Sequence, residues 1–200
     1  MDFDRTLDRP ARFRICFVCT GNICRSPMAE VVFRELAEAA GLGDTVQVLS
    51  AGTGDWHVGE RADHRTLQSL ALRGYDGSLH RARQFDTEWF ARLDLIVVAD
   101  RGQERILKSW AQTDADRDKV RLLLGFDHEQ ASTIDVPDPY YSDAAEFDRV
   151  LAMVESACAA LFRQLEPGLR ALHQDSGTVV AAAGDADVLD LPDHHTSGDA

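Results

Sequence analysis

Short runs of apolar residues alternate along the chain with longer segments in which apolar positions recur at helical spacing. The apolar runs predict four strands, at residues 13–18, 46–49, 93–98 and 120–124. The helical spacing predicts four helices, at residues 27–40, 63–73, 101–111 and 144–165. Strands that alternate with helices predict an α/β fold, in which a parallel sheet carries helices on both faces.

The two ends of the chain differ in composition from the segment between them. Residues 1–12 are expected to form a flexible arm, because they carry mixed charge without periodicity. Pro167 and Gly168 predict that the last helix has ended before them. Residues 167–200 are rich in Ala, Gly, Asp and His and predict a disordered acidic tail, in which His194 and His195 are solvated rather than metal-bound. A single domain, residues 13–166, is left between the two.

The overall composition narrows the classes of function. The 200 residues carry a formal net charge of −13, which argues against a nucleic acid or an anionic membrane surface as partner. No run of apolar residues is long enough to span a membrane, and the N-terminus lacks the layout of a signal peptide. The four cysteines do not resemble a disulfide framework. We expect a cytoplasmic protein that works as a monomer, although export without a signal stays open.

The segment from Val18 to Pro27, with the sequence VCTGNICRSP, joins the first predicted strand to the first predicted helix. Gly21 permits a tight turn, and the loop amides together with the helix N-terminus can converge on an anion. Arg25 adds a planar fork that matches two phosphate oxygens. Cys19 lies in the middle of this positive potential, which favours its thiolate. The segment therefore predicts a site that binds a phosphoryl group and holds a nucleophile against the phosphorus.

Three plainer interpretations of this segment are weaker. Cys19 and Cys24 could be buried packing residues, as most free cysteines are. A metal site would need a second pair of ligands at suitable spacing, and the chain offers none. A phosphate loop without catalysis would need Gly and Lys rather than a central thiol. We therefore expect neither a metal nor a cofactor.

Cleavage of a phosphate ester also needs an acid for the leaving oxygen, and Asp138 is the best candidate. It stands between Pro137 and Pro139, which stiffen the backbone, and Tyr140 and Tyr141 follow at once. A rigid carboxyl group beside aromatic walls suits a pocket for a phenyl ring. The alternative is an ordinary aspartate in a turn beside a proline.

Residues 15–29, 50–53 and 137–141 together resemble the low-molecular-weight protein tyrosine phosphatases, most closely the bacterial members of actinomycete type. The resemblance runs from about residue 13 to about residue 165. It implies a four-stranded parallel sheet of order 2-1-3-4, with the loop at a topological switch point. It also implies the hydrolysis of phosphotyrosine in proteins, or of small aryl phosphates, through a phosphocysteine on Cys19. Arg25 would bind the phosphoryl oxygens, and Asp138 would act as acid and then as base.

The same resemblance assigns supporting roles to further residues. The phosphate-binding and loop-supporting set is Thr20, Gly21, Asn22, Ile23, Cys24, Ser26, Ser50 and His80. Ser26 would donate a hydrogen bond to the Cys19 sulfur, and Cys24 would form a reversible disulfide with Cys19 under oxidant. The substrate cleft would be walled by Trp56, His57, Tyr140 and Tyr141. For His80 a plain exposed histidine is an equal alternative, and for Asp100 we weigh support of the acid loop against an N-cap of the following helix.

Three other functions remain as alternatives. A thiol-dependent arsenate reductase of the same fold needs a relay of further cysteines, and residues 75–100 contain none. A phosphoarginine phosphatase of the same family would carry a small polar residue in place of Ile23 and would lack Tyr140 and Tyr141. A module that binds phosphate or phosphotyrosine without turnover would not require Asp138 in its stiff frame.

Overall fold

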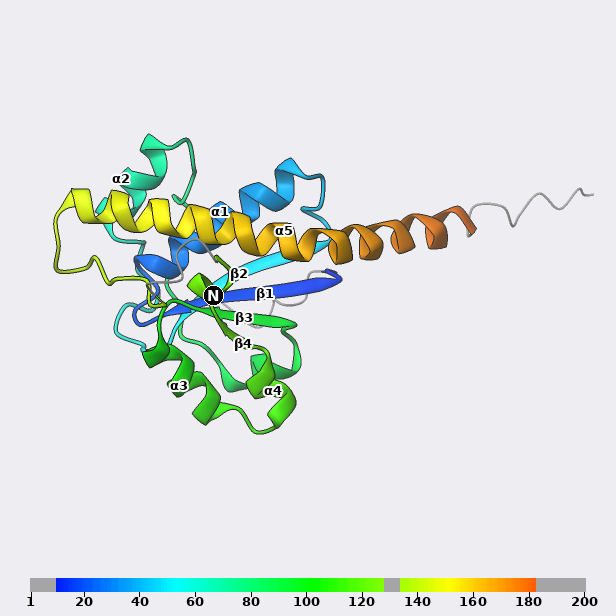
Figure 1. Ribbon diagram of the computed structural model, residues 1–200, viewed down its shortest axis with the longest axis horizontal. Helices are drawn as coiled ribbons and strands as arrows, with labels where there is room; N and C mark the ends of the chain where they lie inside the picture. Colours follow the sequence, from blue (N-terminus) through cyan, green and yellow to red (C-terminus); the bar gives the residue numbers. More distant parts are fainter. Residues whose placement is uncertain (1–9, 128–133, 183–200) are drawn as a thin grey trace, which may run out of the picture.

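The computed structural model describes residues 10–127 and 134–182 (Figure 1). Its strands are β1 (Phe13–Cys19), β2 (Val46–Gly52), β3 (Leu95–Val98) and β4 (Val120–Leu122). Its α-helices are α1 (Arg25–Ala39), α2 (His64–Leu72), α3 (Arg101–Trp110), α4 (Asp114–Asp118) and α5 (Ala144–Ala182). Two 3-10 helices are η2 (Thr87–Ala91) and η3 (Leu123–Phe126).

The four strands form one parallel sheet in the order β2-β1-β3-β4. This confirms the predicted α/β fold and the predicted strand order. Strand β1 pairs with β2 on one side and β3 on the other, so its carboxyl end, Cys19, lies at the point where the chain direction across the sheet reverses. Open parallel sheets bind their ligands at such a point.

The sheet is buried on both faces because side chains alternate along a strand. Ile15 and Phe17 of β1 pack in a core with α1, α2 and α5, whereas Cys16 and Val18 pack in a second core with η2 and α3. Figure 1 shows the resulting layers, with α1, α2 and α5 on one side of the sheet and α3 and α4 on the other. The two layers hold the β1 terminus between them.

Some elements differ from their predicted extent for local reasons. Strand β4 ends at Leu122 because the next residues form η3. The short elements η2 and α4 were not predicted. Asp86 and Thr113 cap their first turns, and elements of only five residues carry too few apolar positions to show a period.

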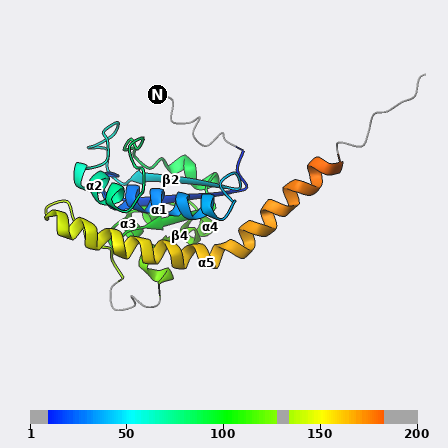
Figure 2. The ribbon, with the colours of Figure 1, turned by 90° about the horizontal axis from the view of Figure 1, so that it is seen from above.

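The prediction that the last helix ends before Pro167 is wrong. Helix α5 continues through Pro167 to Ala182, so residues 167–182 are not a disordered tail. Leu169 is only 2% exposed in the α1–α5 core, and His173 Nδ1 lies 2.8 Å from Thr45 Oγ1. A proline ring cannot donate the helical hydrogen bond and bends the helix axis. Figure 2 shows α5 bending along its length, and the buried Leu169 side chain lies beyond Pro167.

The domain therefore extends past the predicted boundary at residue 166. The rest of the predicted tail, from residue 183 on, and residues 1–9 of the predicted arm lie outside the described residues. No helix within residues 10–127 and 134–182 is long and apolar enough to cross a membrane.

We predict that Leu169→Ala destabilises the fold by about 2–5 kcal/mol, because it removes a buried leucine side chain from the core. The measurement is the free energy of unfolding in urea. Leu72→Ala is the matched control, since Leu72 is 74% exposed and should cost little. Equal and small losses for the two variants would contradict the packing of this part of α5 on the domain.

Candidate active site

The loop between β1 and α1 forms the centre of the site. Strand β1 places Cys19 at its carboxyl end, and α1 begins six residues later at Arg25, so the helix N-terminus faces the loop. The loop lies tightly against the end of β2: a Cβ atom on Gly52 would come within 2.7 Å of the Thr20 carbonyl oxygen. A glycine is therefore required at this contact.

Asn22 holds the loop in its shape. Its φ of 55° lies in the left-handed region, which asparagine tolerates better than most residues, and the residue is fully buried. Its side-chain amide donates to Ser26 Oγ and to Ser50 Oγ, each at 2.9 Å. Its Oδ1 accepts from the Arg83 backbone N–H at 2.9 Å, and its carbonyl accepts from His80 Nε2 at 2.8 Å. Ser50, His80 and Arg83 lie outside the loop, so the surrounding fold helps to impose the loop conformation.

Ser26 connects this network to the thiol. Its Oγ lies 3.0 Å from Cys19 Sγ and 3.3 Å from the Ala51 carbonyl. The Asn22 amide donates to this oxygen, and Ser26 donates its single hydroxyl hydrogen to the Ala51 carbonyl. The same hydrogen can turn to the sulfur, which lies at the shorter distance.

Glu30 belongs to the same network, although the sequence analysis did not select it. Ser50 donates its hydroxyl hydrogen to the Glu30 carboxylate, and His80 Nδ1 lies 3.7 Å from it. Burial alone would raise the pKa of Glu30, but the hydrogen bonds from His80 and Ser50 lower it below its usual value. Glu30 follows Ser26 by one helical turn, and that spacing was the only signal in the sequence.

Arg25 points its guanidinium group toward two carboxylates. One nitrogen donates to Asp100 at 2.8 Å and to the Val136 carbonyl at 3.2 Å, and the other donates to Asp138 at 2.6 Å and to Thr20 at 3.4 Å. Burial alone would lower the pKa of Arg25, but the Cys19 sulfur and the Asp138 carboxylate raise it. The arginine therefore stays charged at the mouth of the loop.

Asp100 is the N-cap of α3, which is one of the two roles weighed for it, and among the described residues its other side-chain contacts reach Arg25 and Gln103 rather than the acid loop. One carboxylate oxygen caps α3 through the Gly102 and Gln103 backbone N–H groups, at 2.7 and 3.1 Å. The other accepts from Arg25 and from the Gln103 side chain, each at 2.8 Å. Gln103, which was not predicted, also donates to Thr20 Oγ1 at 3.0 Å. Helix α3 thus holds Arg25 and the start of the loop.

Asp138 reaches the loop from a segment more than a hundred residues away. Its side chain is 49% exposed, and one carboxylate oxygen bonds Arg25 while the other accepts from the Tyr140 backbone N–H at 3.2 Å. The Val136 backbone N–H donates to the Ala99 carbonyl at 2.9 Å, which fixes the segment to the end of β3. The carboxyl group therefore stands beside the thiol with access to solvent.

A cavity of about 340 Å³ lies over the thiol. It is lined by Cys19, Thr20, Gly21, Ile23, Cys24, Arg25, Trp56, His57, Asp138, Tyr140 and Tyr141. The other predicted site residues, Asn22, Ser26, Ser50 and His80, are buried around the loop and form its support. His80 is 8% exposed, so the alternative of a plain exposed histidine is wrong.

Aromatic side chains form the walls of this cavity. Trp56 is 69% exposed and packs over Gly54, where a Cβ atom would lie 1.8 Å from the indole ring. The His57 ring is 6.2 Å from that of Tyr140, and the Tyr140 ring is 4.9 Å from that of Tyr141. The walls suit a flat ring that enters from solvent.

The remaining cysteines are poor nucleophiles. The pKa of Cys24 is raised to about 12, mainly by burial and to a smaller extent by the charges of Cys19 and Asp63. Burial also raises the pKa values of Cys16 and Cys158, which are fully buried in the two cores as packing residues. All four cysteines are free thiols in the structure.

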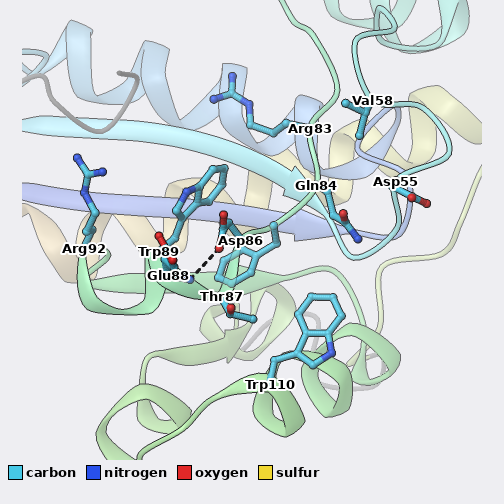
Figure 3. Close-up of a pocket in the computed structure, with 11 residues that line it drawn as sticks. Asp55, Val58, Arg83, Gln84, Asp86, Thr87, Glu88, Trp89, Arg92 and Trp110 are labelled. Carbon is cyan, nitrogen blue, oxygen red and sulfur yellow. Dashed lines mark hydrogen bonds between the residues drawn. The ribbon is translucent and has the colours of Figure 1, made fainter. Parts of the chain in front are cut away.

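Figure 3 shows a second and larger hollow, of about 950 Å³. Trp89, Arg92 and Trp110 line it, together with Asp55 and Val58 from the loop that carries Trp56 and His57. None of the predicted site residues lines this hollow. Its size therefore does not mark the reaction centre.

Comparisons with known proteins agree with this geometry. Residues 14–171 match the family described as low molecular weight phosphotyrosine protein phosphatase. The chain is 55% identical over 150 residues to a low molecular weight protein-tyrosine-phosphatase of Streptomyces coelicolor, covering 74% of this chain and 91% of that one. It is 47% identical over 148 residues to low molecular weight protein-tyrosine phosphatase A of Mycobacterium tuberculosis, covering 74% and 88%. A crystal structure of a protein tyrosine phosphatase from Entamoeba histolytica superposes with a TM-score of 0.74 at 33% identity, covering 78% and 98%.

The fold and the matched sequence therefore define a phosphoric monoester hydrolase. The chain belongs to the low molecular weight protein-tyrosine phosphatases, which hydrolyse phosphotyrosine through a phosphocysteine intermediate.

Proposed function

We propose that Cys19 is the nucleophile of this phosphatase, that Arg25 and the loop amides bind the phosphoryl group, and that Asp138 is the acid. One observation carries the proposal. The three side chains come from β1, from the first turn of α1 and from a distant segment, and all line the same cavity of about 340 Å³. A thiol, a cation and a carboxyl group that meet in one cleft supply what a two-step phosphoryl transfer needs.

In the first step, the Cys19 sulfur attacks phosphorus while the bond to the aryl oxygen breaks, and Asp138 donates its proton to that oxygen. In the second step, Asp138 takes a proton from water, the water oxygen bonds to phosphorus, and the sulfur–phosphorus bond breaks. Ser26 donates to the departing sulfur from 3.0 Å. The phosphoryl oxygens carry most of the charge in a loose transition state, so Arg25 and the amides of residues 20–26 stabilise it.

Arg25 and Asp138 are bonded to each other at 2.6 Å. A phosphoryl group in the loop competes with Asp138 for the guanidinium group. Binding of substrate therefore releases the Asp138 carboxyl group from Arg25 toward the leaving oxygen. Binding of the phosphoryl group and positioning of the acid are thus coupled.

The walls of the cleft favour aryl phosphates. Trp56 and Tyr140 offer flat apolar faces to a phenyl ring, and Ile23 lines the cavity where a polar residue would be needed for a guanidinium leaving group. These residues argue against the phosphoarginine alternative. Cys16 and Cys158 are buried in the two cores rather than in the cleft, which argues against an arsenate reductase relay.

The setting of the enzyme is part of the proposal. The site is complete within one chain, so a monomer suffices for the reaction. A working thiolate suits the reducing cytoplasm, which we propose as its location. The Cys19–Cys24 disulfide that the family implies would protect Cys19 from overoxidation there.

We predict that Cys19→Ser removes turnover and keeps the oxyanion site. Hydrolysis of p-nitrophenyl phosphate should fall by at least about a thousandfold, because a hydroxyl group is a far weaker nucleophile than a thiolate. The affinity for inorganic phosphate, measured by calorimetry, should stay within about threefold of wild type. Turnover that is retained in Cys19→Ser would refute the assignment of Cys19 as the nucleophile.

We predict that Asp138→Ala slows substrates in proportion to their need for a proton. The kcat/KM, which reports the first step alone, should fall by about 10²–10⁴-fold for an aryl phosphate whose phenol leaves poorly, whereas one whose phenol leaves readily as its anion should lose little. The measurement is kcat/KM over a series of aryl phosphates. An equal loss for all members of the series would rule out the acid role.

A further inference from the structure

The guanidinium group of Arg65, on α2, binds the segment that follows Asp138. One terminal nitrogen donates to the Ser142 carbonyl at 2.8 Å, and the other donates to the Tyr140 carbonyl at 2.9 Å. These carbonyls lie four and two residues after Asp138. Arg65 thus fixes the segment on its carboxyl-terminal side, while Val136 fixes it to β3 on the other side.

The same guanidinium group also forms an ion pair with Asp63. Arg65 Nε lies 3.0 Å from Asp63 Oδ1, and the second terminal nitrogen lies 2.8 Å from Oδ2, which is a two-point contact. Hydrogen bonds from Arg65 lower the pKa of Asp63, so the pair stays charged well below neutral pH. Asp63 also caps α2, and its backbone N–H donates to the Ile23 carbonyl at 2.9 Å. A continuous series of contacts therefore runs from the phosphate loop through Asp63 and Arg65 to the acid segment.

A third contact fixes the plane of the guanidinium group. Its central carbon lies 4.4 Å from the ring centroid of Phe147, which is fully buried at the start of α5. A planar cation over an aromatic face is stabilising, and only arginine combines it with a fork of donors. Asp63, the two carbonyls and Phe147 thus define one position for Arg65.

Between its two fixed points the acid segment is short and stiff. Pro137 and Pro139 lack an N–H group, so the backbone on both sides of Asp138 has fewer donors with which to bond the fold. The Ser142 N–H donates to the nearby Pro139 carbonyl, at 2.8 Å. Arg25 holds the Asp138 carboxylate itself, and the contacts made at Tyr140 and Ser142 hold the backbone that carries Asp138 and the Tyr140 wall.

We propose, on the basis of the acid role proposed for Asp138, that Arg65 is a positioning residue that holds the Asp138 carboxyl group at the leaving oxygen. Arg65 does not line the cavity over Cys19, so it acts through the segment and not on the substrate. Proton transfer requires the acid within hydrogen-bond reach of the leaving oxygen, and a misplacement of about 1 Å can cost about 10²-fold in rate. Loss of Arg65 therefore weakens proton transfer to the leaving oxygen in the first step, and it does so most for phenols that leave poorly as anions.

The test compares kcat/KM, which reports the first step alone, over a series of aryl phosphates whose phenols increase in basicity, in the full-length chain. The variants are Arg65→Gln, Arg65→Lys, Asp138→Ala and the double variant Asp138→Ala with Arg65→Gln. The matched control is Arg73→Gln. Arg73 also connects α2 to other elements, through Glu155 and the Asp148 carbonyl of α5, but it does not touch the acid segment.

In Arg65→Gln we expect kcat/KM to fall at least about tenfold for the most basic phenol and less than about twofold for the least basic one. Arg65→Lys should lie between this variant and wild type, because an ammonium group can reach a carbonyl but cannot form the fork. Arg73→Gln should keep the wild-type dependence on the phenol. Adding Arg65→Gln to Asp138→Ala should cause no further loss of kcat/KM, since the acid to be positioned is already gone.

Two results would overturn the assignment of Arg65 and leave the acid role of Asp138 intact. One is a steep dependence in Asp138→Ala together with a uniform loss in Arg65→Gln. The other is that adding Arg65→Gln to Asp138→Ala lowers kcat/KM by the same factor as Arg65→Gln lowers it in the wild-type background. A wild-type dependence in Asp138→Ala would instead refute the acid role, and the Arg65 assignment with it. If Arg65→Gln unfolds, the same comparison rests on Arg65→Lys, where a wild-type dependence would be the contradicting result.

Discussion

The side chain of Asn22 forms hydrogen bonds in three directions from a fully buried position, and the shape of the phosphate loop depends on them. A non-glycine residue with a φ of 55° is held there only when its surroundings over-determine it. Ser26, Ser50 and the Arg83 backbone do so, and an unpaired amide in this place would cost about 1–3 kcal/mol per buried group. These contacts fix the loop conformation from the protein side, which is the preorganisation that electrostatic catalysis requires.

Charge is distributed so that this small positive region persists in an acidic protein. The chain has a formal net charge of −13, yet the centre of the site combines Arg25, a helix N-terminus and a ring of backbone N–H groups. Asp100 and Asp138 both bond Arg25, and Glu30 lies behind the loop rather than in it. In the proposed mechanism, an anion that enters the loop meets donors, and Asp138 carries the transferable proton.

The sequence allowed the central motif to be predicted because its meaning is local. Cys19, Gly21 and Arg25 stand between a strand and a helix, and that context alone implies an anion site. Asp138 was selected from its stiff proline frame, whereas the strand order and the supporting residues followed from the resemblance of the motifs to a family, and the strand order agrees with the structure. The distant contacts were not predictable in the same way. Glu30 and Gln103 look like ordinary polar residues of α1 and α3, and Arg65 looks like a surface arginine, because their partners lie 20, 83 and more than 70 residues away.

At Pro167 the sequence analysis applied a local rule, and packing in the folded protein overrides that rule. A proline usually ends a helix, but Leu169 and His173 beyond it contact the domain, and α5 bends and continues. The two kinds of error have one cause: sequence patterns report the chain within a few turns, whereas the side chains that complete the core and the site are brought together by the fold.

The most direct test of the preformed loop is the affinity of the Asn22→Gly variant for inorganic phosphate, measured by calorimetry. Glycine adopts the same backbone conformation without strain and removes only the side-chain amide. If the amide network holds the loop, phosphate should bind at least about tenfold more weakly than to wild type, a difference of about 1.4 kcal/mol. An unchanged affinity in a folded Asn22→Gly protein would contradict the claim that this network shapes the site.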